Sequence, residues 1–312
     1  MNTPNLLRRA SALLLLLLTV LPALAARRAE HVFIISIDGG KPAVIEQSAM
    51  PALKHMVADG AHTWLANTIF PSKTLPSHTS MLTGVGPEKH LVSWNNWIPG
   101  AGVVKVSTVF SEAKKAGLTT AMFVGKEKFR HLLIPGTVDM FDYNKAQSGA
   151  PAKNGAPDPT KKMAEGTVLA KTVAADAAPY IKSNKPNLCM LHLTDTDNTG
   201  HKFGWGSPEQ IKAFGDVDAA LDIIMGAIKD AGIADSSVVI VSADHGGHEK
   251  THGLNTPDDM HIPWIAWGKG VKKGTTISAP VTTYDTAATA LWLLDVPRPT
   301  SFDGQPVTSA FE

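Results

Sequence analysis

Short apolar runs alternate with amphipathic stretches along this 312-residue chain, and each run leads into a polar or glycine-bearing loop. Continuous apolar runs of this length are typical of strands that are buried on both faces of a parallel sheet. The runs are 32–37, 120–124, 188–193, 238–242 and 262–267. Strands that alternate with helices predict a doubly wound α/β fold, in which a mostly parallel sheet has helices on both faces.

Two stretches between these runs have the apolar period of a helix. One extends from Pro51 to Ala61 and the other from Ser207 to Ala231, where Ser207 can cap the helix and Pro208 suits its first turn. Segment 144–162 differs, because it is rich in Ala, Gly, Pro and Lys and has no apolar period. This composition predicts a flexible surface loop.

The amino-terminal residues have the order of a secretory signal. Arg8 and Arg9 precede an apolar stretch with six consecutive leucines, and the small-residue motif 23–25 follows. An uncleaved anchor is the alternative, but the stretch is shorter than the about 20 apolar residues that span a bilayer. We therefore expect a cleaved signal peptide at 1–25, export to the periplasm or the medium, and a single catalytic domain over 26–312.

The charge argues against a nucleic-acid-binding protein, and the cysteine content excludes a protein stabilised by intramolecular disulfides. The formal net charge is +1 and no long basic run is present, so the sequence does not indicate binding to a nucleic acid polymer. A small-molecule partner is therefore expected. Cys189 is the one cysteine, so an intramolecular disulfide cannot form, and its apolar surroundings predict a buried side chain.

Carboxylates and histidines follow three of the predicted strands. They are Asp38 after the first run, Asp195, Asp197 and His201 after the third, and Asp244, His245 and His252 after the fourth. One such residue by itself is most often a helix cap, a turn former or a surface side chain. Together they predict a site for two metal ions, because the carboxyl ends of parallel strands share one edge of the sheet. A mixed set of carboxylates and imidazoles suits zinc.

A hydroxyl nucleophile is offered within the segment 70–78. Pro76 fits the first turn of a helix there, so Thr74 would lie near a helix amino terminus, where free N–H groups attract an anion. Thr74 could instead be only a capping hydroxyl, and Ser77 and Thr79 are rivals. Metal coordination would activate the hydroxyl, and two ions about 4 Å apart would hold both oxygens of a phosphoryl transfer.

Five motifs, taken in order, resemble the alkaline phosphatase superfamily and most closely its nucleotide pyrophosphatase/phosphodiesterase branch. They are Ile37-Asp38-Gly39, Phe70-Pro71-x-x-Thr74-x-Pro76-x-His78, Asp197-x-x-Gly200-His201, Ser242-Ala243-Asp244-His245-Gly246 and Thr251-His252-Gly253. The resemblance implies two ligand sets, each around one zinc ion. One set is Asp38, Thr74, Asp244 and His245, and the other is Asp197, His201 and His252. It also implies a transient phosphothreonine at Thr74 that water hydrolyses.

The same branch uses an asparagine after the nucleophile to bind a phosphoryl oxygen. Asn95 fits this role best, and Asn96 stays open because the residues before it depart from the family pattern. His261 is a rival to His252, which is preferred since a glycine follows it. Aromatic side chains near the rim could stack on a base or sugar, although packing is their more common role. They are Trp94, Trp97, Trp205 and Trp264.

The implied activity is hydrolysis of a phosphoric ester or phosphoanhydride, of the phosphodiesterase or nucleotide pyrophosphatase type. A sulfatase would need Cys or Ser in place of Thr74 and an arginine in place of His78, so it is disfavoured. The scarcity of arginines beyond the amino terminus, Arg130 and Arg298, favours diesters, because arginine clamps commonly bind monoester dianions.

Three alternatives remain. A phosphomonoesterase stays open because lysines could replace the arginine clamp, namely Lys73, Lys126 and Lys128. A phosphonate hydrolase stays open because the same ions would stabilise its transition state. The non-enzymatic alternative is an exported zinc-binding protein without turnover, and the presence of Thr74 beside all the ligands argues against it.

Overall fold

An eight-stranded sheet forms the centre of the protein, in the order β4-β3-β5-β1-β6-β7-β2-β8. The computed structural model describes residues 27–143 and 167–312, so the expected signal peptide (1–25) and loop (144–162) lie outside the described residues. The strands are β1 (His31–Ile37), β2 (Ala61–Asn67), β3 (Thr120–Val124), β4 (Met140–Asp142), β5 (Leu188–Leu193), β6 (Ser237–Ala243), β7 (His261–Gly268) and β8 (Thr275–Thr276). Strand β7 runs antiparallel to β6 and β2, while the other pairs are parallel. The predicted mostly parallel sheet is confirmed.

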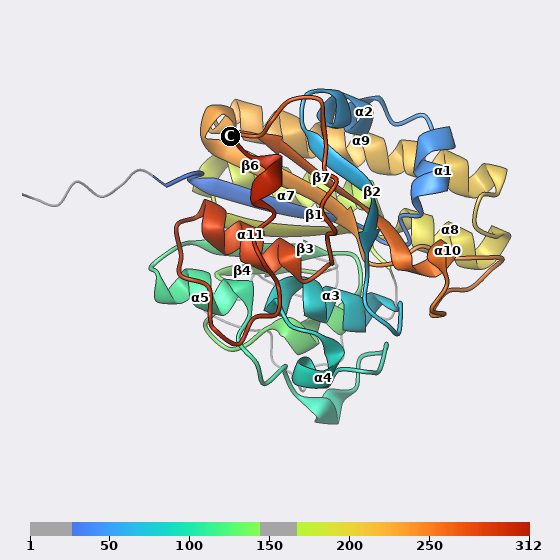
Figure 1. Ribbon diagram of the computed structural model, residues 1–312, viewed down its shortest axis with the longest axis horizontal. Helices are drawn as coiled ribbons and strands as arrows, with labels where there is room; N and C mark the ends of the chain where they lie inside the picture. The colour runs from blue at the N-terminus through green and yellow to red at the C-terminus, as the bar shows by residue number, and fades with distance from the viewer. Residues whose placement is uncertain (1–26, 144–166) are drawn as a thin grey trace, which may run out of the picture.

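Helices lie on both faces of this sheet (Figure 1). One face carries α1 (Pro42–Gln47), α2 (Pro51–Ala58), α7 (Ala170–Asn184), α8 (Asp195–Phe203) and α9 (Pro208–Asp230), and α9 contacts the other four. The opposite face carries α3 (Thr74–Thr83), α5 (Val109–Lys115) and α11 (Asp285–Leu293). The short helices are α4 (Pro87–His90) and α10 (Pro257–Met260), with 3-10 turns η1 (Pro99–Ala101), η2 (Glu127–Leu132), η3 (Ala234–Ser236) and η4 (Thr308–Ala310). The doubly wound arrangement is therefore confirmed.

The three central strands, β5, β1 and β6, supply the middle of the core. All residues of β5 and β6 are buried, and so are six of the seven in β1. Helices on both faces leave no solvent side, which explains why these strands are continuously apolar rather than alternating. Cys189 lies in β5 and is fully buried, as expected, and burial raises the pKa of its thiol.

The helix expected from Pro51 to Ala61 ends earlier than predicted. Helix α2 stops at Ala58, and Ala61 already begins β2, which pairs with β7. The reason lies at Gly60, where an added Cβ atom would stand 2.2 Å from the carbonyl oxygen of Ala266. The chain passes so close to β7 at this glycine that another helical turn does not fit. Helix α9, by contrast, follows its prediction.

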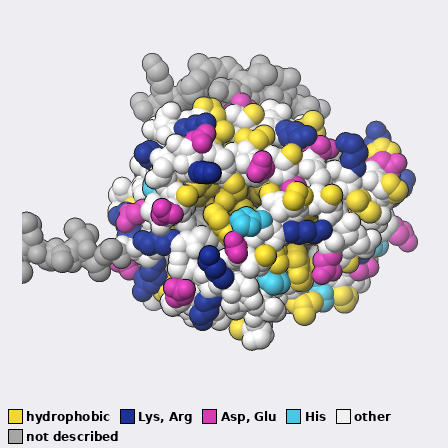
Figure 2. All heavy atoms as spheres, turned by 90° about the horizontal axis from the view of Figure 1, so that it is seen from above, with side chains coloured by type: hydrophobic (Ala, Val, Ile, Leu, Met, Phe, Trp, Pro, Cys, Tyr) yellow, Lys and Arg dark blue, Asp and Glu magenta, His cyan; other side chains and the backbone are white. Residues whose placement is uncertain are grey.

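The face seen from the upper side of Figure 1 carries charges of both signs. Basic and acidic side chains are interspersed over its described part (Figure 2). Such a surface differs from the continuous basic patch that nucleic acid phosphates attract. Within residues 27–143 and 167–312, no helix combines the length and apolarity needed to cross a membrane.

Candidate active site

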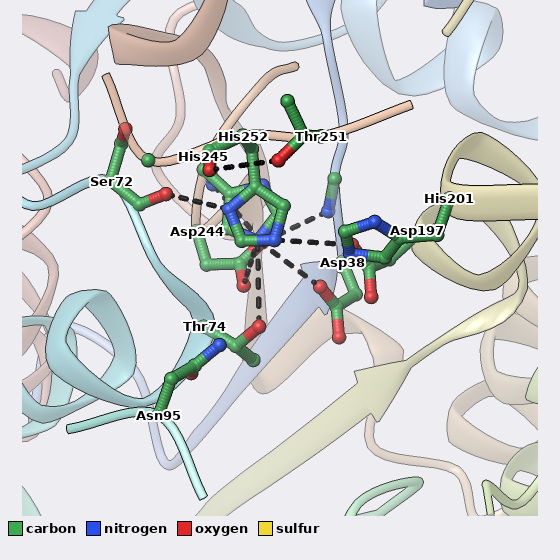
Figure 3. Close-up of polar contacts among 12 residues, drawn as sticks. Asp38, Ser72, Thr74, Asn95, Asp197, His201, Asp244, His245, Thr251 and His252 are labelled. Carbon is green, nitrogen blue, oxygen red and sulfur yellow. Dashed lines mark hydrogen bonds and ion pairs between the residues drawn. The ribbon is translucent and has the colours of Figure 1, made fainter. Parts of the chain in front are cut away.

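The candidate site lies where three neighbouring parallel strands end. Asp38 directly follows β1, Asp244 directly follows β6, and Asp197 lies in the first turn of α8 just after β5. Because β5, β1 and β6 are adjacent and parallel, their carboxyl ends bring these carboxylates to one edge of the sheet. Figure 3 shows the labelled carboxylates, imidazoles and Thr74 pointing toward one another.

The side chains fall into two groups that could hold a metal ion. One group is Asp38, Asp244 and His245, and the other is Asp197, His245 and His252. In each group the ligand atoms all lie within 4.8 Å of one another. His245 belongs to both groups, whereas the resemblance placed it in one set only. His201 lies at the rim, with its Nε2 atom 3.3 Å from Oδ1 of Asp197.

Three histidines are oriented in the same way. Each has its Nδ1 atom within hydrogen-bond distance of a backbone carbonyl, to which Nδ1–H can donate. The carbonyls are those of Gly246 for His245 (2.8 Å), Ser72 for His252 (2.8 Å) and Lys250 for His201 (3.0 Å). This arrangement leaves the Nε2 lone pairs facing the carboxylates, which is the tautomer that a metal-binding histidine needs.

The environment keeps two of these imidazoles neutral. Burial lowers the pKa of His245, and burial together with His245 lowers the pKa of His252 to about 3. Their rings are stacked, with centroids 3.6 Å apart and planes 10° apart. His201 differs, because the Asp197 carboxylate, 3.3 Å from its Nε2 atom, raises its pKa.

The three carboxylates are buried and incompletely hydrogen-bonded. Among the described residues, Asp38 Oδ1, Asp197 Oδ1 and Asp244 Oδ2 have no hydrogen-bond donor. Burial, followed by Asp38 and Asp197, raises the pKa of Asp244 well above its ordinary value. Burial also disfavours the charged form of Asp38, but the Lys126 ammonium holds the pKa of Asp38 well below its ordinary value. Buried carboxylate oxygens without donors, beside neutral imidazoles, fit divalent cations with mixed O and N ligands.

Thr74 is the first residue of helix α3 and is 1% exposed. Its Oγ1 atom lies 3.4 Å from Nε2 of His245. Its carbonyl accepts a hydrogen bond from Nδ1 of His78 at 2.8 Å, and Nε2 of His78 accepts one from Ser36 at 2.7 Å. His78 therefore links the start of helix α3 to strand β1, and this link holds Thr74 at the edge of the sheet.

The rival readings of this segment do not fit the structure. The residue at the N-cap is Lys73, so the reading of Thr74 as only a capping hydroxyl is wrong. The hydroxyl of Ser77 is occupied by a hydrogen bond with Thr68 at 2.9 Å. The hydroxyl of Thr79 donates to the carbonyl of Leu75 within its own helix. Thr74 is thus the one of the three hydroxyls that faces the histidine and carboxylate groups.

Asn95 lies beside Thr74 (Figure 3). Its Oδ1 atom accepts from the backbone N–H of Leu75 at 2.8 Å and from Nζ of Lys128 at 3.1 Å. Two donors on the oxygen fix the orientation of the amide and leave its NH2 group able to donate to a bound anion. Asn96, the alternative, lines a neighbouring cavity instead.

That cavity has a volume of about 480 Å³ and adjoins the site through two lysines. Its lining residues are Asn96, Trp97, Lys126, Glu127, Lys128, Tyr143 and Thr167. Of the expected rim tryptophans, Trp97 thus lines this cavity, while the ring of Trp205 lies 5.3 Å from that of His201 and 5.9 Å from that of His252. Trp264 is fully buried, with its Nε1 atom bonded to Thr286 at 3.1 Å, so the expectation that it lies near the rim is wrong.

His252 is placed by a carboxylate that the sequence analysis missed. Asp259 is fully buried in α10 and its Oδ2 atom accepts from the backbone N–H groups of Gly253 (2.8 Å) and Leu254 (2.7 Å). Its Oδ1 atom lies 2.7 Å from Nδ1 of His248. These bonds hold the loop that carries His252. Nothing local in the sequence around Asp259 indicates this role, since its partners lie across a loop.

Replacement of this carboxylate is expected to destabilise the protein. Asp259→Ala should lower the free energy of unfolding by about 2–4 kcal/mol, because buried backbone donors lose a charged acceptor. The matched control is Asp258→Ala, which removes an exposed ion pair with Lys41 and should change it by less than about 1 kcal/mol. Urea denaturation of both variants gives the comparison. Equal stability of the two variants would show that Asp259 does not hold the loop.

Comparison with known proteins identifies the family. The family model for type I phosphodiesterase / nucleotide pyrophosphatase matches residues 32–262. The chain belongs to this family. The match begins in β1 and extends into β7, so it includes the candidate site from Asp38 to His252. The predicted relationship to this branch of the alkaline phosphatase superfamily is confirmed.

Curated relatives are longer than this chain. A venom phosphodiesterase from Crotalus durissus collilineatus is 25% identical over 222 residues, which is 69% of this chain but 26% of that protein. Rat ectonucleotide pyrophosphatase/phosphodiesterase family member 3 is 23% identical over 219 residues, or 69% of this chain and 24% of the relative. The matched region thus spans about a quarter of the length of these relatives.

Solved structures share the fold at low identity. Murine ectonucleotide pyrophosphatase/phosphodiesterase 5, an inactive variant in complex with AMP, has a TM-score of 0.70 and 16% identity, covering 91% of this chain and 100% of that one. A 2-O GAG sulfatase has a TM-score of 0.68 and 13% identity, covering 90% of this chain and 74% of that one. The alkaline phosphatase-like fold is confirmed by both.

Proposed function

We propose that this protein is a metal-dependent phosphoric ester hydrolase, a phosphodiesterase or nucleotide pyrophosphatase that acts through a phosphothreonine at Thr74 with two zinc ions. The observation that carries the proposal is the convergence of the Nε2 atoms of His245 and His252 and the three buried carboxylates beside the Thr74 hydroxyl. Family membership supports the same reaction class.

The ligand sets proposed are those of the sequence analysis. Asp38, Thr74, Asp244 and His245 hold one ion, and Asp197, His201 and His252 hold the other. Bound ions would lower the pKa of the Thr74 hydroxyl and neutralise charge on the phosphoryl oxygens. Asp259 holds the loop that carries His252. The three backbone carbonyls beside the Nδ1 atoms fix the rings of His201, His245 and His252.

The chain's own residues then account for the chemical steps. The Thr74 oxygen loses its proton and forms a bond to phosphorus, while the bond to the leaving oxygen breaks and that oxygen takes up a proton. Asn95 donates from its NH2 group to a phosphoryl oxygen, since its Oδ1 atom is already held by Leu75 and Lys128. Water then attacks the phosphorus held on Thr74, the bond between phosphorus and the Thr74 oxygen breaks, and the phosphomonoester product leaves as that oxygen regains its proton.

A diester is the preferred substrate class. The two arginines beyond the amino terminus are used elsewhere: Arg298 donates to the backbone carbonyls of Phe302 and Gly304, and Arg130 lies over the Trp97 ring and bonds Glu127. The arginine clamp that commonly binds a monoester dianion is therefore not formed by them. A monoester or phosphonate hydrolase is the second candidate, because Lys128 lines the cavity beside Asn95.

Substrate profiling separates these candidates. Purified protein should hydrolyse bis-p-nitrophenyl phosphate with a kcat/KM at least about tenfold above that for p-nitrophenyl phosphate, because no arginine clamp stabilises the second charge of the monoester. A nucleoside triphosphate and a phosphonate complete the series, with release of nitrophenol, nucleoside monophosphate or phosphate as the measurement. A higher kcat/KM for the monoester or the phosphonate would favour the second candidate. No turnover of any of the four would favour a zinc-binding protein without activity.

Location and domain organisation are further parts of the proposal. We infer that residues 1–25 are a cleaved signal peptide, that 26–312 form one catalytic domain, and that the protein is periplasmic or secreted. The composition of the first 25 residues supports this inference. The names of the matched relatives, venom phosphodiesterases and ectonucleotide pyrophosphatases, describe proteins that act outside cells.

A further inference from the structure

Lys126 lies between the two candidate metal-binding groups. It follows strand β3, and its Nζ atom is 2.6 Å from Oδ2 of Asp38 and 2.5 Å from Oδ2 of Asp197. We propose that Lys126 is an internal cation that competes with metal ions for these carboxylates and so sets metal affinity and the rate of metal release. The inference rests on the proposed function, because it assumes that the two groups bind metal.

The competition follows from which carboxylates the ammonium group contacts. Asp38 belongs to the group with Asp244 and His245, while Asp197 belongs to the group with His245 and His252. Lys126 thus touches one carboxylate of each group. The ammonium group lies against Oδ2 of each carboxylate, while Oδ1 of each faces the histidines, so a metal ion on Oδ1 would share its carboxylate with the ammonium group. Two cations that share one carboxylate repel each other.

Burial makes this interaction strong. The side chain of Lys126 is 10% exposed and those of Asp38 and Asp197 are 0% and 4% exposed, so water screens the three charges weakly. The Nζ atom of Lys126 lies between two carboxylate oxygens, which is the geometry of a charge-assisted ammonium–carboxylate hydrogen bond on each side.

A neighbouring lysine shows that this placement is specific. Lys128 is two residues away, but its Nζ atom bonds the amide oxygen of Asn95 at 3.1 Å rather than a carboxylate. Lys128 therefore offers a matched control: a partly buried lysine on the same segment, without an ion pair to the candidate ligands among the described residues.

The test compares zinc binding by Lys126→Met, Lys128→Met and wild type. Methionine keeps the length of the side chain and removes its charge. Competition with a chromophoric chelator should give a zinc dissociation constant at least tenfold lower for Lys126→Met than for wild type, because the competing cation is gone. Lys128→Met should stay within threefold of wild type. An unchanged or higher dissociation constant for Lys126→Met would overturn the proposal and assign the ammonium another task, such as contact with substrate.

A second measurement covers the case in which Lys126→Met does not fold without metal. Each protein is purified with zinc, and transfer of zinc to excess EDTA is followed in time. Release from Lys126→Met should be at least threefold slower than from wild type, since the ammonium can no longer take over the carboxylates. Equal or faster release would contradict the inference. Absence of zinc binding by wild type would overturn the proposed function as well, whereas normal wild-type binding with an unaltered variant would overturn the role of Lys126 alone.

Discussion

Thr74→Ala is expected to lower kcat/KM for bis-p-nitrophenyl phosphate by about 10³-fold or more, which is the scale on which loss of a nucleophile acts. The hydroxyl is buried at the start of α3 and lies 3.4 Å from Nε2 of His245, so no other side-chain oxygen of this helix can replace it without moving the backbone. Initial rates of nitrophenol release at several substrate concentrations provide the measurement.

The matched control is Ser77→Ala in the same helix. Ser77 is also fully buried, but its hydroxyl bonds Thr68, so activity should stay within about threefold of wild type. Acid quenching of the wild-type reaction with bis-p-nitrophenyl phosphate followed by mass spectrometry should find a p-nitrophenyl phosphoryl group on the peptide that contains Thr74. Wild-type activity in Thr74→Ala would show that another group attacks phosphorus.

Removal of metal is the second change with a large expected effect. Dialysis against EDTA should abolish turnover, and zinc should restore it. Free zinc at about 100 times its dissociation constant stabilises the native state by about 2.7 kcal/mol per site. For a domain of this size that corresponds to a rise in Tm of roughly 5–10 °C. Differential scanning fluorimetry with zinc and with EDTA measures this shift.

Two controls distinguish the loss of bound metal from a general effect of EDTA on the protein. Thr74→Ala should keep most of the rise in Tm, because six of the seven proposed ligands remain, although its turnover is lost. Zinc added at equimolar amounts to the EDTA should remove the effect in all proteins. If Tm and turnover were both unchanged by EDTA, the two clusters of carboxylates and histidines would not be metal sites, and the proposed mechanism would fail.

The apolar runs of β1, β5 and β6 could be read from the sequence because strands covered by helices on both faces have no polar alternation. The same topology predicts, from the sequence alone, that Asp38, Asp197 and Asp244 lie at one edge of the sheet. The carboxyl ends of neighbouring parallel strands lie at the same edge of the sheet, whatever residues separate the strands in sequence. Helix α9 was equally readable, since Ser207, Pro208 and the apolar period are all local signals.

Strand β2 and the positions of Lys126 and Asp259 could not be read in this way. The helical period before β2 simply continues, and what ends it is the close approach of Gly60 to the carbonyl of Ala266, more than two hundred residues further along the chain. Lys126 meets Asp38 and Asp197 only once β3 lies beside β5. Asp259 acts by accepting hydrogen bonds from a loop, and no spacing rule describes that contact.

The sequence by itself therefore determined the fold class, the family and the identity of the candidate ligands, because strand burial and the motifs at strand ends are encoded over a few neighbouring residues. The tertiary structure decided which carboxylates and histidines lie within reach of one another, which hydroxyl faces them and which charge lies between them. Those properties depend on distances of a few ångströms between residues that are far apart in the chain, and only the packed sheet and its loops fix such distances.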